Sequence, residues 1–171
     1  TSFISFEFQG DDKLQLYGYG DNATQLHLRT SSRYRDTAGW YHIVVYIDSA
    51  NSSAKLYVNG AEPPLDTSTQ PTTNYNFHIN NNVPHSIGRS QTTNNYYFDG
   101  YLSQFYHLDG ILRNASHFGY TDQYGVWRPK KYKRRSPNNG TQWSNNVSGN
   151  IYSGTAANIF SSDLTSVAIN G

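Results

Sequence analysis

The chain has 171 residues, a net charge of +1, 36% hydrophobic residues and 15 tyrosines, and it contains neither Cys nor Met. Its length suffices for one full-sized core, and the lack of Cys excludes disulfides, thiolate metal sites and thiol nucleophiles. A nearly neutral chain creates no field that attracts nucleic acid, and no segment reaches the roughly 20 apolar residues of a membrane span. We therefore expect neither nucleic-acid binding nor membrane insertion.

Short runs of β-branched and aromatic residues, separated by Gly, Asp and Asn, predict an all-β sandwich. The run at 40–48 is followed by one at 55–60 that ends in Asn-Gly, so these two are expected to pair as antiparallel neighbours. The run at 96–110 alternates imperfectly around a glycine, which predicts a bulged strand pair at a sheet centre. In chain order we expect strands over 2–9, 13–19, 24–30, 40–48, 54–59, 75–79, 84–89 and 96–108, with loops at 61–74 and 90–95.

Beyond residue 110 the sequence no longer consists of strand-like runs. Residues 111–119 predict a single helical turn ended by glycine. Six of the eight residues at 128–135 are Lys or Arg, a density that suits either a solvated linker, a patch that docks on an acidic neighbour, or a grip on phosphate. We place the sandwich at 1–135, and assign 136–171 to a linker and the start of a following module or an extended tail.

Four short motifs occur in a family order. They are WYHIVV at 40–45, LYVNG at 56–60, SIG at 86–88 and FDGYL at 98–102. With them the chain resembles the concanavalin A-like, laminin-G-type antiparallel jelly-roll β-sandwich. The family has further strands before the position of Phe3, so N-terminal strands of the sandwich are expected to be missing here or supplied by another segment.

A narrower resemblance rests on residues 98–110, followed by FGYTD at 118–122 and GVWRPKKY at 125–132. This order is similar to laminin-G-type modules in the virion and tail-fibre proteins of marine phages. The resemblance covers about residues 3–135. It implies a location on the virion surface or outside the cell, and a homo-oligomer within a larger assembly.

Enzyme chemistry is disfavoured by the carboxylates. Glycosidases need two carboxyl groups that flank one sugar bond, and glucanases of this fold carry paired Glu on one strand. Here the two glutamates, Glu7 and Glu62, belong to different predicted elements. Asp99 and Asp109 are the best remaining pair, and each adjoins a glycine, where turn or bulge geometry explains an Asp. We therefore expect no catalytic residues.

Sugar binding needs flat aromatic faces beside hydrogen-bonding side chains. Tyrosines next to asparagines have this chemistry, and Tyr17 and Tyr19 near Asp21 and Asn22 share it. The residues predicted to bind carbohydrate are Tyr96, Tyr97, Asn94, Asn95, Tyr75 and Asn74. Strand tyrosines that simply divide between core and solvent are the competing interpretation for each.

Calcium is the ion that best suits the remaining polar residues, because hard cations prefer carboxylate and carbonyl oxygens. Sandwiches of the resembled type often hold one at a loop rim. The candidate ligands are Asp11, Asp12, Asp21 and Asp48. Ordinary turn chemistry also explains these residues, and no other cofactor is expected.

The sequence thus predicts a non-enzymatic structural and adhesion module of a phage virion or tail fibre, which binds cell-surface carbohydrate or neighbouring virion subunits. The alternative is a purely architectural spacer or decoration domain that mediates subunit assembly. A glycan depolymerase is the third and least favoured class. This step relies on fold analogy, and a fold alone does not determine function.

Overall fold

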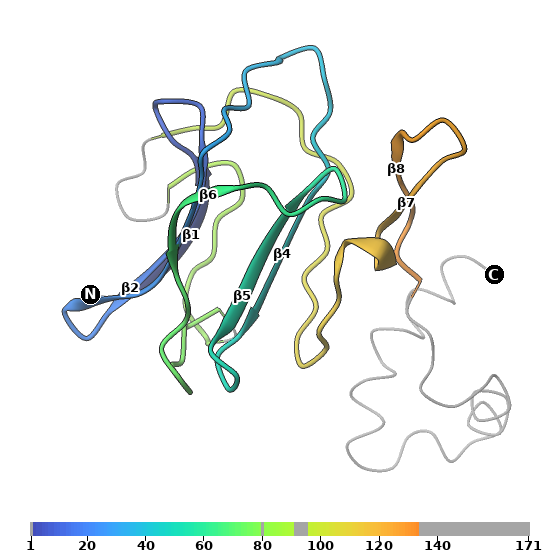
Figure 1. The fold of residues 1–171 in the computed structure, drawn as a ribbon. Coiled ribbons are helices and arrows are strands. Elements are labelled where there is room, and N and C mark those ends of the chain that lie inside the picture. Colours follow the sequence, from blue (N-terminus) through green and yellow to red (C-terminus); the bar gives the residue numbers. More distant parts are fainter. Residues whose placement is uncertain (1, 80, 91–95, 134–171) are drawn as a thin grey trace, which may run out of the picture. The chain divides into compact units, whose positions relative to one another are not determined.

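A computed structural model describes residues 2–79, 81–90 and 96–133 (Figure 1). The chain divides into two compact units, Thr1–Lys131 and Tyr132–Gly171, and the description below concerns the first. Its strands are β1 (Phe3–Phe8), β2 (Leu14–Gly20), β3 (Ala23–Thr30), β4 (Ile43–Asp48), β5 (Ser53–Val58), β6 (Leu65–Thr69), β7 (Gly119–Thr121) and β8 (Trp127–Pro129), with one 3-10 turn, η1 (Ala115–His117). No helix among these residues has the length and apolar character needed to cross a membrane.

Strands β1, β2, β3 and β6 form an antiparallel sheet in that order. The side chains of β2 alternate between the two faces of this sheet: Leu14 and Leu16 are buried, while Gln15 and Tyr17 remain partly exposed. Successive side chains of a strand point to opposite faces, so this alternation gives the sheet one apolar face and one polar, aromatic face.

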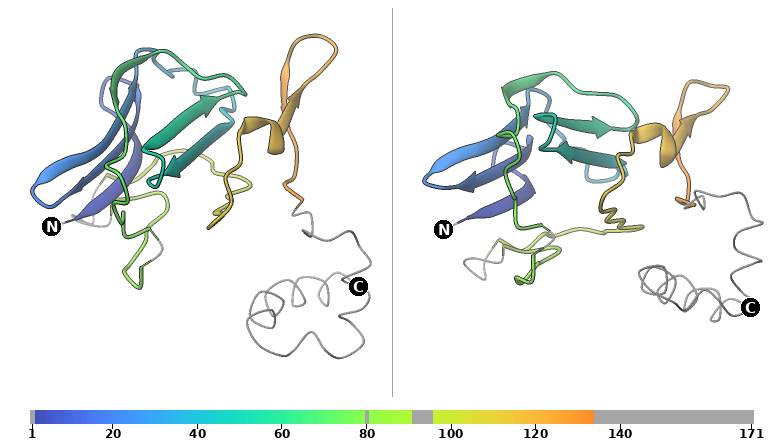
Figure 2. Two further views of the ribbon diagram at one scale, coloured as in Figure 1. Left: turned by 60° about the horizontal axis from the view of Figure 1, so that its bottom comes forward. Right: turned by 90° about the horizontal axis from the view of Figure 1, so that it is seen from below.

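Strands β4 and β5 pair antiparallel and form the second layer (Figure 2). The core lies between the layers, where Leu16, Leu26 and Leu28 of the larger sheet pack with Ala54 of β5 and with Phe77. A tight turn at Asn59 and Gly60, both with positive φ (48° and 84°), closes β5. Two backbone hydrogen bonds join Val58 and Ala61 across it, so the tight turn that the Asn-Gly pair predicts is confirmed.

A small hairpin, β7–β8, follows the 3-10 turn and docks on the end of β4–β5 through Trp127. The indole Nε1 donates a hydrogen bond of 3.1 Å to Nδ1 of His42. A Cβ atom on Gly60 would lie within 2.6 Å of three atoms of the Trp127 ring, and one on Gly119 would also overlap the ring. Two glycines thus give the indole room to lie against backbone on either side.

Five predicted strands are confirmed within two or three residues at each end, namely β1 to β5. The pairing of β4 with β5 and the short helical turn near residue 115 are confirmed too. Strand β6 was wrongly expected to be part of a loop. Its sequence is polar, but its threonines are β-branched and Thr67 and Thr69 pair with Arg29 and His27 on β3.

The expected strands at 75–79, 84–89 and 96–108 are wrong in this structure, which describes no strand between β6 and β7 outside the undescribed positions 80 and 91–95. Left-handed backbone conformations interrupt these runs, with φ of 60° at His78, 78° at Gly88, 56° at Tyr96 and 53° at Gln104. A strand needs continuous negative φ, so the aromatic residues of 96–106 stay outside a sheet and Tyr101 is 87% exposed.

Candidate binding face

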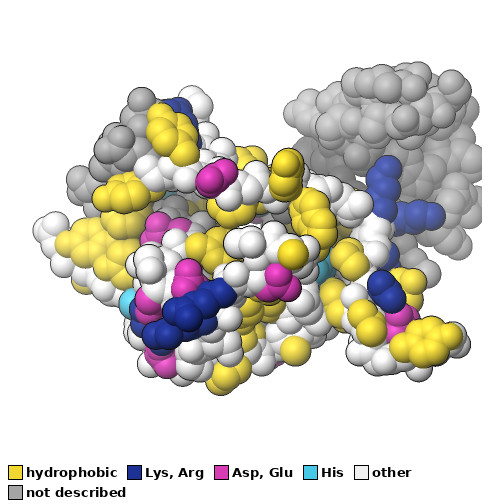
Figure 3. Space-filling model, turned by 90° about the horizontal axis from the view of Figure 1, so that it is seen from above, with side chains coloured by type: hydrophobic (Ala, Val, Ile, Leu, Met, Phe, Trp, Pro, Cys, Tyr) yellow, Lys and Arg dark blue, Asp and Glu magenta, His cyan; other side chains and the backbone are white. Residues whose placement is uncertain are grey.

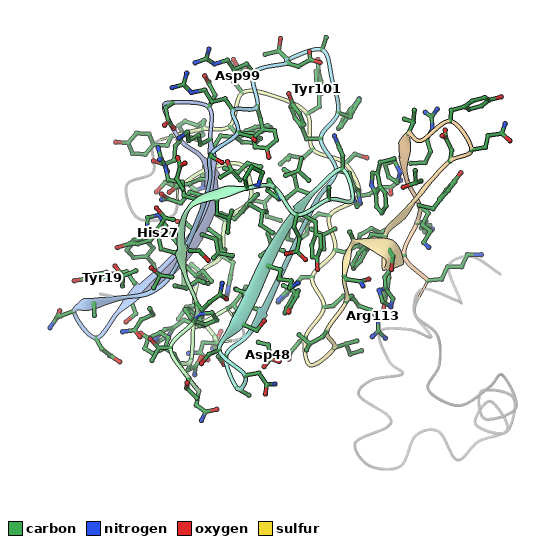
Figure 4. The ribbon with its side chains drawn as sticks, viewed as in Figure 1. Tyr19, His27, Asp48, Asp99, Tyr101 and Arg113 are labelled. Atoms are coloured by element: carbon green, nitrogen blue, oxygen red, sulfur yellow. The ribbon has the colours of Figure 1, made fainter. Side chains whose placement is uncertain are left out.

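The outer face of the four-stranded sheet carries a regular grid of aromatic and polar side chains, because its register aligns residues of three or four strands. The first row joins Phe3, Tyr19 and Thr24, the second joins Ser5, Tyr17, His27 and Thr69, and the third joins Glu7, Gln15, Arg29 and Thr67. In Figure 4, Tyr19 and His27 point away from β4 and β5, into solvent. We call these eleven residues the binding face.

Aromatic rings concentrate in the first two rows. The ring of Phe3 stacks on Tyr19 at a centroid distance of 6.1 Å and lies 5.8 Å from the ring of Tyr17. Tyr17 in turn contacts His27 edge-on at 5.0 Å. All four rings are partly exposed, so their outer edges and faces are open to a ligand while their mutual contacts limit rotation.

Beside the rings, a hydrogen-bonded relay crosses three strands. His27 Nε2 lies 3.0 Å from Gln15 Oε1, and Gln15 Nε2 donates to Glu7 Oε1 over 3.3 Å. Ser5 Oγ donates to the same carboxylate oxygen over 3.4 Å. Each amide and carboxylate has further hydrogen-bonding capacity, so the relay holds polar groups in place and leaves them able to bond a ligand hydroxyl.

At the far end of the face the charges neutralise one another. Arg29 pairs with Asp11 at 2.5 Å and with Asp66 at 3.6 Å, and Lys13 also pairs with Asp66. Seen from above, Lys and Arg side chains lie intermixed with Asp and Glu side chains (Figure 3). Burial alone would raise the pKa of Asp11, but the charges of Arg29 and Lys13 and the hydrogen bonds from the Lys13 backbone and from Arg29 together lower it.

His27 is the titratable group nearest the aromatic rows. Its partial burial, and the positive charge of Arg29 two residues along β3, lower its pKa below the ordinary value. The imidazole is therefore neutral at physiological pH and can donate to Gln15 through Nε2 while Nδ1 accepts a hydrogen bond.

The structure separates the tyrosines and asparagines that were predicted to bind carbohydrate. Asn94 and Asn95 lie outside the described residues, while Tyr96 and Tyr97 are 81% and 67% exposed. Their neighbour Phe98 stacks on Phe8, at the β1–β2 turn. These two tyrosines thus belong to that end of the sandwich.

Tyr75 and Asn74 belong to the opposite end. The Tyr75 hydroxyl fills the space over Gly20, at the other end of β2, and Asn74 N donates to Ser49 O in the β4–β5 turn. Strand β2 from Leu14 to Gly20 spans roughly 20 Å, so Tyr75 and Asn74 do not form one rim with Tyr96 and Tyr97.

The four predicted calcium ligands are also apart. Asp11 and Asp12 lie in the β1–β2 turn and are paired with Arg29 and Arg35, whereas Asp21 lies in the β2–β3 turn, at the other end of β2. Asp48 accepts hydrogen bonds from Asn51. Within the described ranges no three His, Asp or Glu side chains are grouped to hold a metal ion, and calcium binding stays a prediction.

A pocket of about 450 Å³ lies away from the binding face, between β5 and β6. Gln70 partly closes it by accepting a hydrogen bond of 2.7 Å from Ala54 N, and a salt bridge of 2.7 Å joins Lys55 to Glu62 beside it. Its lining mixes polar side chains with the apolar ones of Ala54, Leu56, Pro63 and Leu65, and no aromatic ring is among the residues that form it.

The sequence pointed to part of the binding face. Tyr17 and Tyr19 were identified by their chemistry, but Phe3, Glu7, Gln15, His27 and Arg29 were not recognised as their neighbours. The strict alternation of β2 was the signal, since Gln15, Tyr17 and Tyr19 lie on the face opposite the buried Leu14 and Leu16. The residues of β1 and β3 that lie beside them follow only from the register.

A family model described as the concanavalin A-like lectin/glucanases superfamily, of laminin-G type, matches residues 1–116. Neither the curated proteins nor the solved structures contain a match to this chain. The match covers well over half of the sequence and agrees with the antiparallel, all-β architecture, so the predicted fold class is confirmed. The chain belongs to the concanavalin A-like lectin/glucanase superfamily.

Proposed function

We propose that this chain is a non-enzymatic carbohydrate-binding module that presents the outer face of its four-stranded sheet to a cell-surface polysaccharide. The observation that carries the proposal is the grid itself, in which the Phe3, Tyr17 and Tyr19 rings adjoin the Glu7–Gln15–His27 relay. The family supplies a fold suited to binding a glycan or a protein.

The chemistry of the face favours a sugar. A pyranose ring has an apolar face of C–H groups that packs on an aromatic ring, and a rim of hydroxyls that both donate and accept hydrogen bonds. The binding face offers rings in two rows and a fixed donor–acceptor relay in the next positions. Because the relay is already hydrogen-bonded internally, little side-chain freedom is lost when a ligand binds.

Binding without cleavage fits the carboxylates. Glu7 is held by Ser5 and Gln15, and two acidic side chains next to the third row, Asp11 and Asp66, are held in ion pairs with Arg29 and Lys13. A hydrolase needs a protonated acid and a free carboxylate that face one bond. The binding face presents instead one hydrogen-bonded carboxylate, and the two carboxylates beside it are paired with cations.

The setting that we propose for this module is the surface of a phage virion or tail fibre, in a homo-oligomeric assembly. The support is the similarity of residues 98–132 to modules of such particles. Immunogold labelling of intact particles with an antibody raised against the module tests this setting. Label on the particle surface is expected, and its absence from particles that contain the protein would contradict it.

The test of carbohydrate binding is a polysaccharide pull-down and glycan-array screen of the wild type, with and without calcium. The Tyr17→Ala/Tyr19→Ala variant is expected to lose binding. Tyr96→Ala/Tyr97→Ala reports on the rim that the sequence predicted, and Tyr124→Ala, which removes a 79% exposed ring on the β7–β8 hairpin, is the matched control.

Loss of binding only in Tyr96→Ala/Tyr97→Ala would move the site to that rim. Failure of a folded wild type to bind any glycan would overturn the proposal. A calcium requirement would support the predicted ion.

The second candidate function is subunit assembly, which a specific observation favours. Large apolar side chains on residues 96–106 are exposed, among them Tyr101, Leu102 and Phe105 at 87%, 61% and 68%. Exposed apolar area of this kind marks protein contacts. Sedimentation velocity of the wild type and of the Tyr101→Ser/Phe105→Ser variant tests whether this surface mediates assembly. If it does, the wild type should be an oligomer and the variant a monomer.

A further inference from the structure

The charges of the third row, counted together with the charged side chains that pair with Arg29 beside it, do not balance. Arg29 and Lys13 supply two positive charges, and Asp11 and Asp66, with which they pair, supply two negative ones. Glu7 is the remaining carboxylate of the grid, and its partners Ser5 and Gln15 are neutral. The sum over these five side chains is two minus three, which leaves one negative charge.

That negative charge lies one row away from the ring of Tyr17. Glu7 is in the third row, directly opposite Gln15 and next but one along β1 to Ser5, beside the aromatic second row. Its side chain is exposed. A glycan that stacks on Tyr17 therefore has its neighbouring sugar unit close to this carboxylate, since adjacent rows of a strand are roughly 7 Å apart.

We propose that the binding face selects neutral polysaccharides and disfavours acidic ones, with Glu7 as the specificity-determining residue. This inference rests on the proposed function, because it concerns the ligand of the same face. A hydroxyl of a neutral sugar donates to the free capacity of the Glu7 carboxylate. A sugar carboxylate or sulfate would instead meet a like charge and could donate nothing to it.

The experiment compares matched ligand pairs. The neutral polysaccharide that the wild type binds best, chosen from dextran, mannan, xylan and hydroxyethyl cellulose, is measured beside its carboxymethylated derivative. The proteins are the wild type, Glu7→Gln and Glu62→Gln. Glutamine keeps the shape of Glu7 and can still accept from Ser5 and Gln15, and Glu62→Gln removes the same charge from the β5–β6 connection, where Glu62 pairs with Lys55.

The expected result is a preference of the wild type for the neutral ligand that falls about fivefold in Glu7→Gln, as for removal of one like-charge contact near 4 Å in water. Glu62→Gln should keep the wild-type ratio. High salt should reduce the difference in ligand preference between the wild type and Glu7→Gln, because it screens the charge.

Two results would overturn the inference in distinguishable ways. An unchanged ratio in Glu7→Gln, with neutral and acidic ligands both bound, refutes the role of Glu7 and leaves carbohydrate binding in place. A fall of equal size in Glu62→Gln would show that net charge acts on the ligand, and not the carboxylate on the binding face. Binding to none of the ligands by a folded protein refutes the proposed function together with the inference.

Discussion

Replacement of Gly60 by Ala tests the contact that docks the C-terminal hairpin on β4–β5. Gly60 has a φ of 84°, and the ring of Trp127 occupies the place where a Cβ atom would go. The new methyl group would meet three ring atoms within 2.6 Å. The indole would have to move, and its hydrogen bond to His42 Nδ1 would be lost or lengthened.

Two costs add in this substitution. An alanine in the left-handed region costs about 1–2 kcal/mol, and overpacking of a well-filled contact costs about 1–3 kcal/mol. We therefore expect Gly60→Ala to lower the free energy of unfolding by about 2–5 kcal/mol. Urea denaturation followed by far-UV circular dichroism measures this change.

The control is Gly125→Ala, because Gly125 has nearly the same φ, 79°, and no atom lies within 4 Å of the place that its Cβ would take. It should cost only the backbone strain, about 1–2 kcal/mol. In a Trp127→Ala background, Gly60→Ala should cost the same as Gly125→Ala does in the wild type. Equal effects of Gly60→Ala and Gly125→Ala in the wild type would refute the packing of Trp127 on this turn.

Three further predictions concern the core and pH. Burial lowers the pKa of His42, so on acidification the unfolded state takes up a proton before the folded state does. The contribution of His42 to stability is therefore complete above about pH 7 and falls as the pH drops through about 6.5. His42→Gln should flatten the dependence of the free energy of unfolding on pH, measured by urea titrations between about pH 5 and 8. Thr30→Val should cost about 1–3 kcal/mol by calorimetry, because the buried Thr30 hydroxyl accepts from Leu14 N and donates to Ser32 O, whereas Thr30→Ser should keep both bonds. Leu28→Ala should lower the free energy of unfolding by about 2–5 kcal/mol, since Leu28 is fully buried. A change below about 1 kcal/mol would contradict the place of Leu28 in the core, and Leu112→Ala, at an exposed leucine, is the control.

The parts of the fold that sequence predicts well are those with local causes. Strict alternation specified β2, and the Asn59–Gly60 dipeptide specified the turn after β5. The run at 96–108 has the composition of a strand, but composition does not determine whether a partner strand is available or whether φ becomes positive at Tyr96 and Gln104. Strand β6 shows the converse, because a neighbouring edge on β3 recruits a polar segment.

The candidate site was harder to predict for a related reason. Neighbouring Tyr and Asn in the sequence suggested a rim, yet Tyr75 and Tyr96 belong to opposite ends of the sandwich. The binding face is assembled across strands instead, from residues far apart in the sequence, such as Phe3 and His27, which both contact Tyr17. Only register brings such residues together, and register depends on turn lengths and on the burial of the opposite face.

The position of Trp127 has a mechanical consequence. The chain leaves the described unit directly after β8, and Lys130 N is still bonded to Phe118 O. A pull on the C-terminal side therefore reaches the three paired positions of β7–β8 and the indole between Gly60 and Gly119 before it reaches either sheet. The β7–β8 pairing and the Trp127 contact would then break first under load. The strand register of the binding face would stay intact.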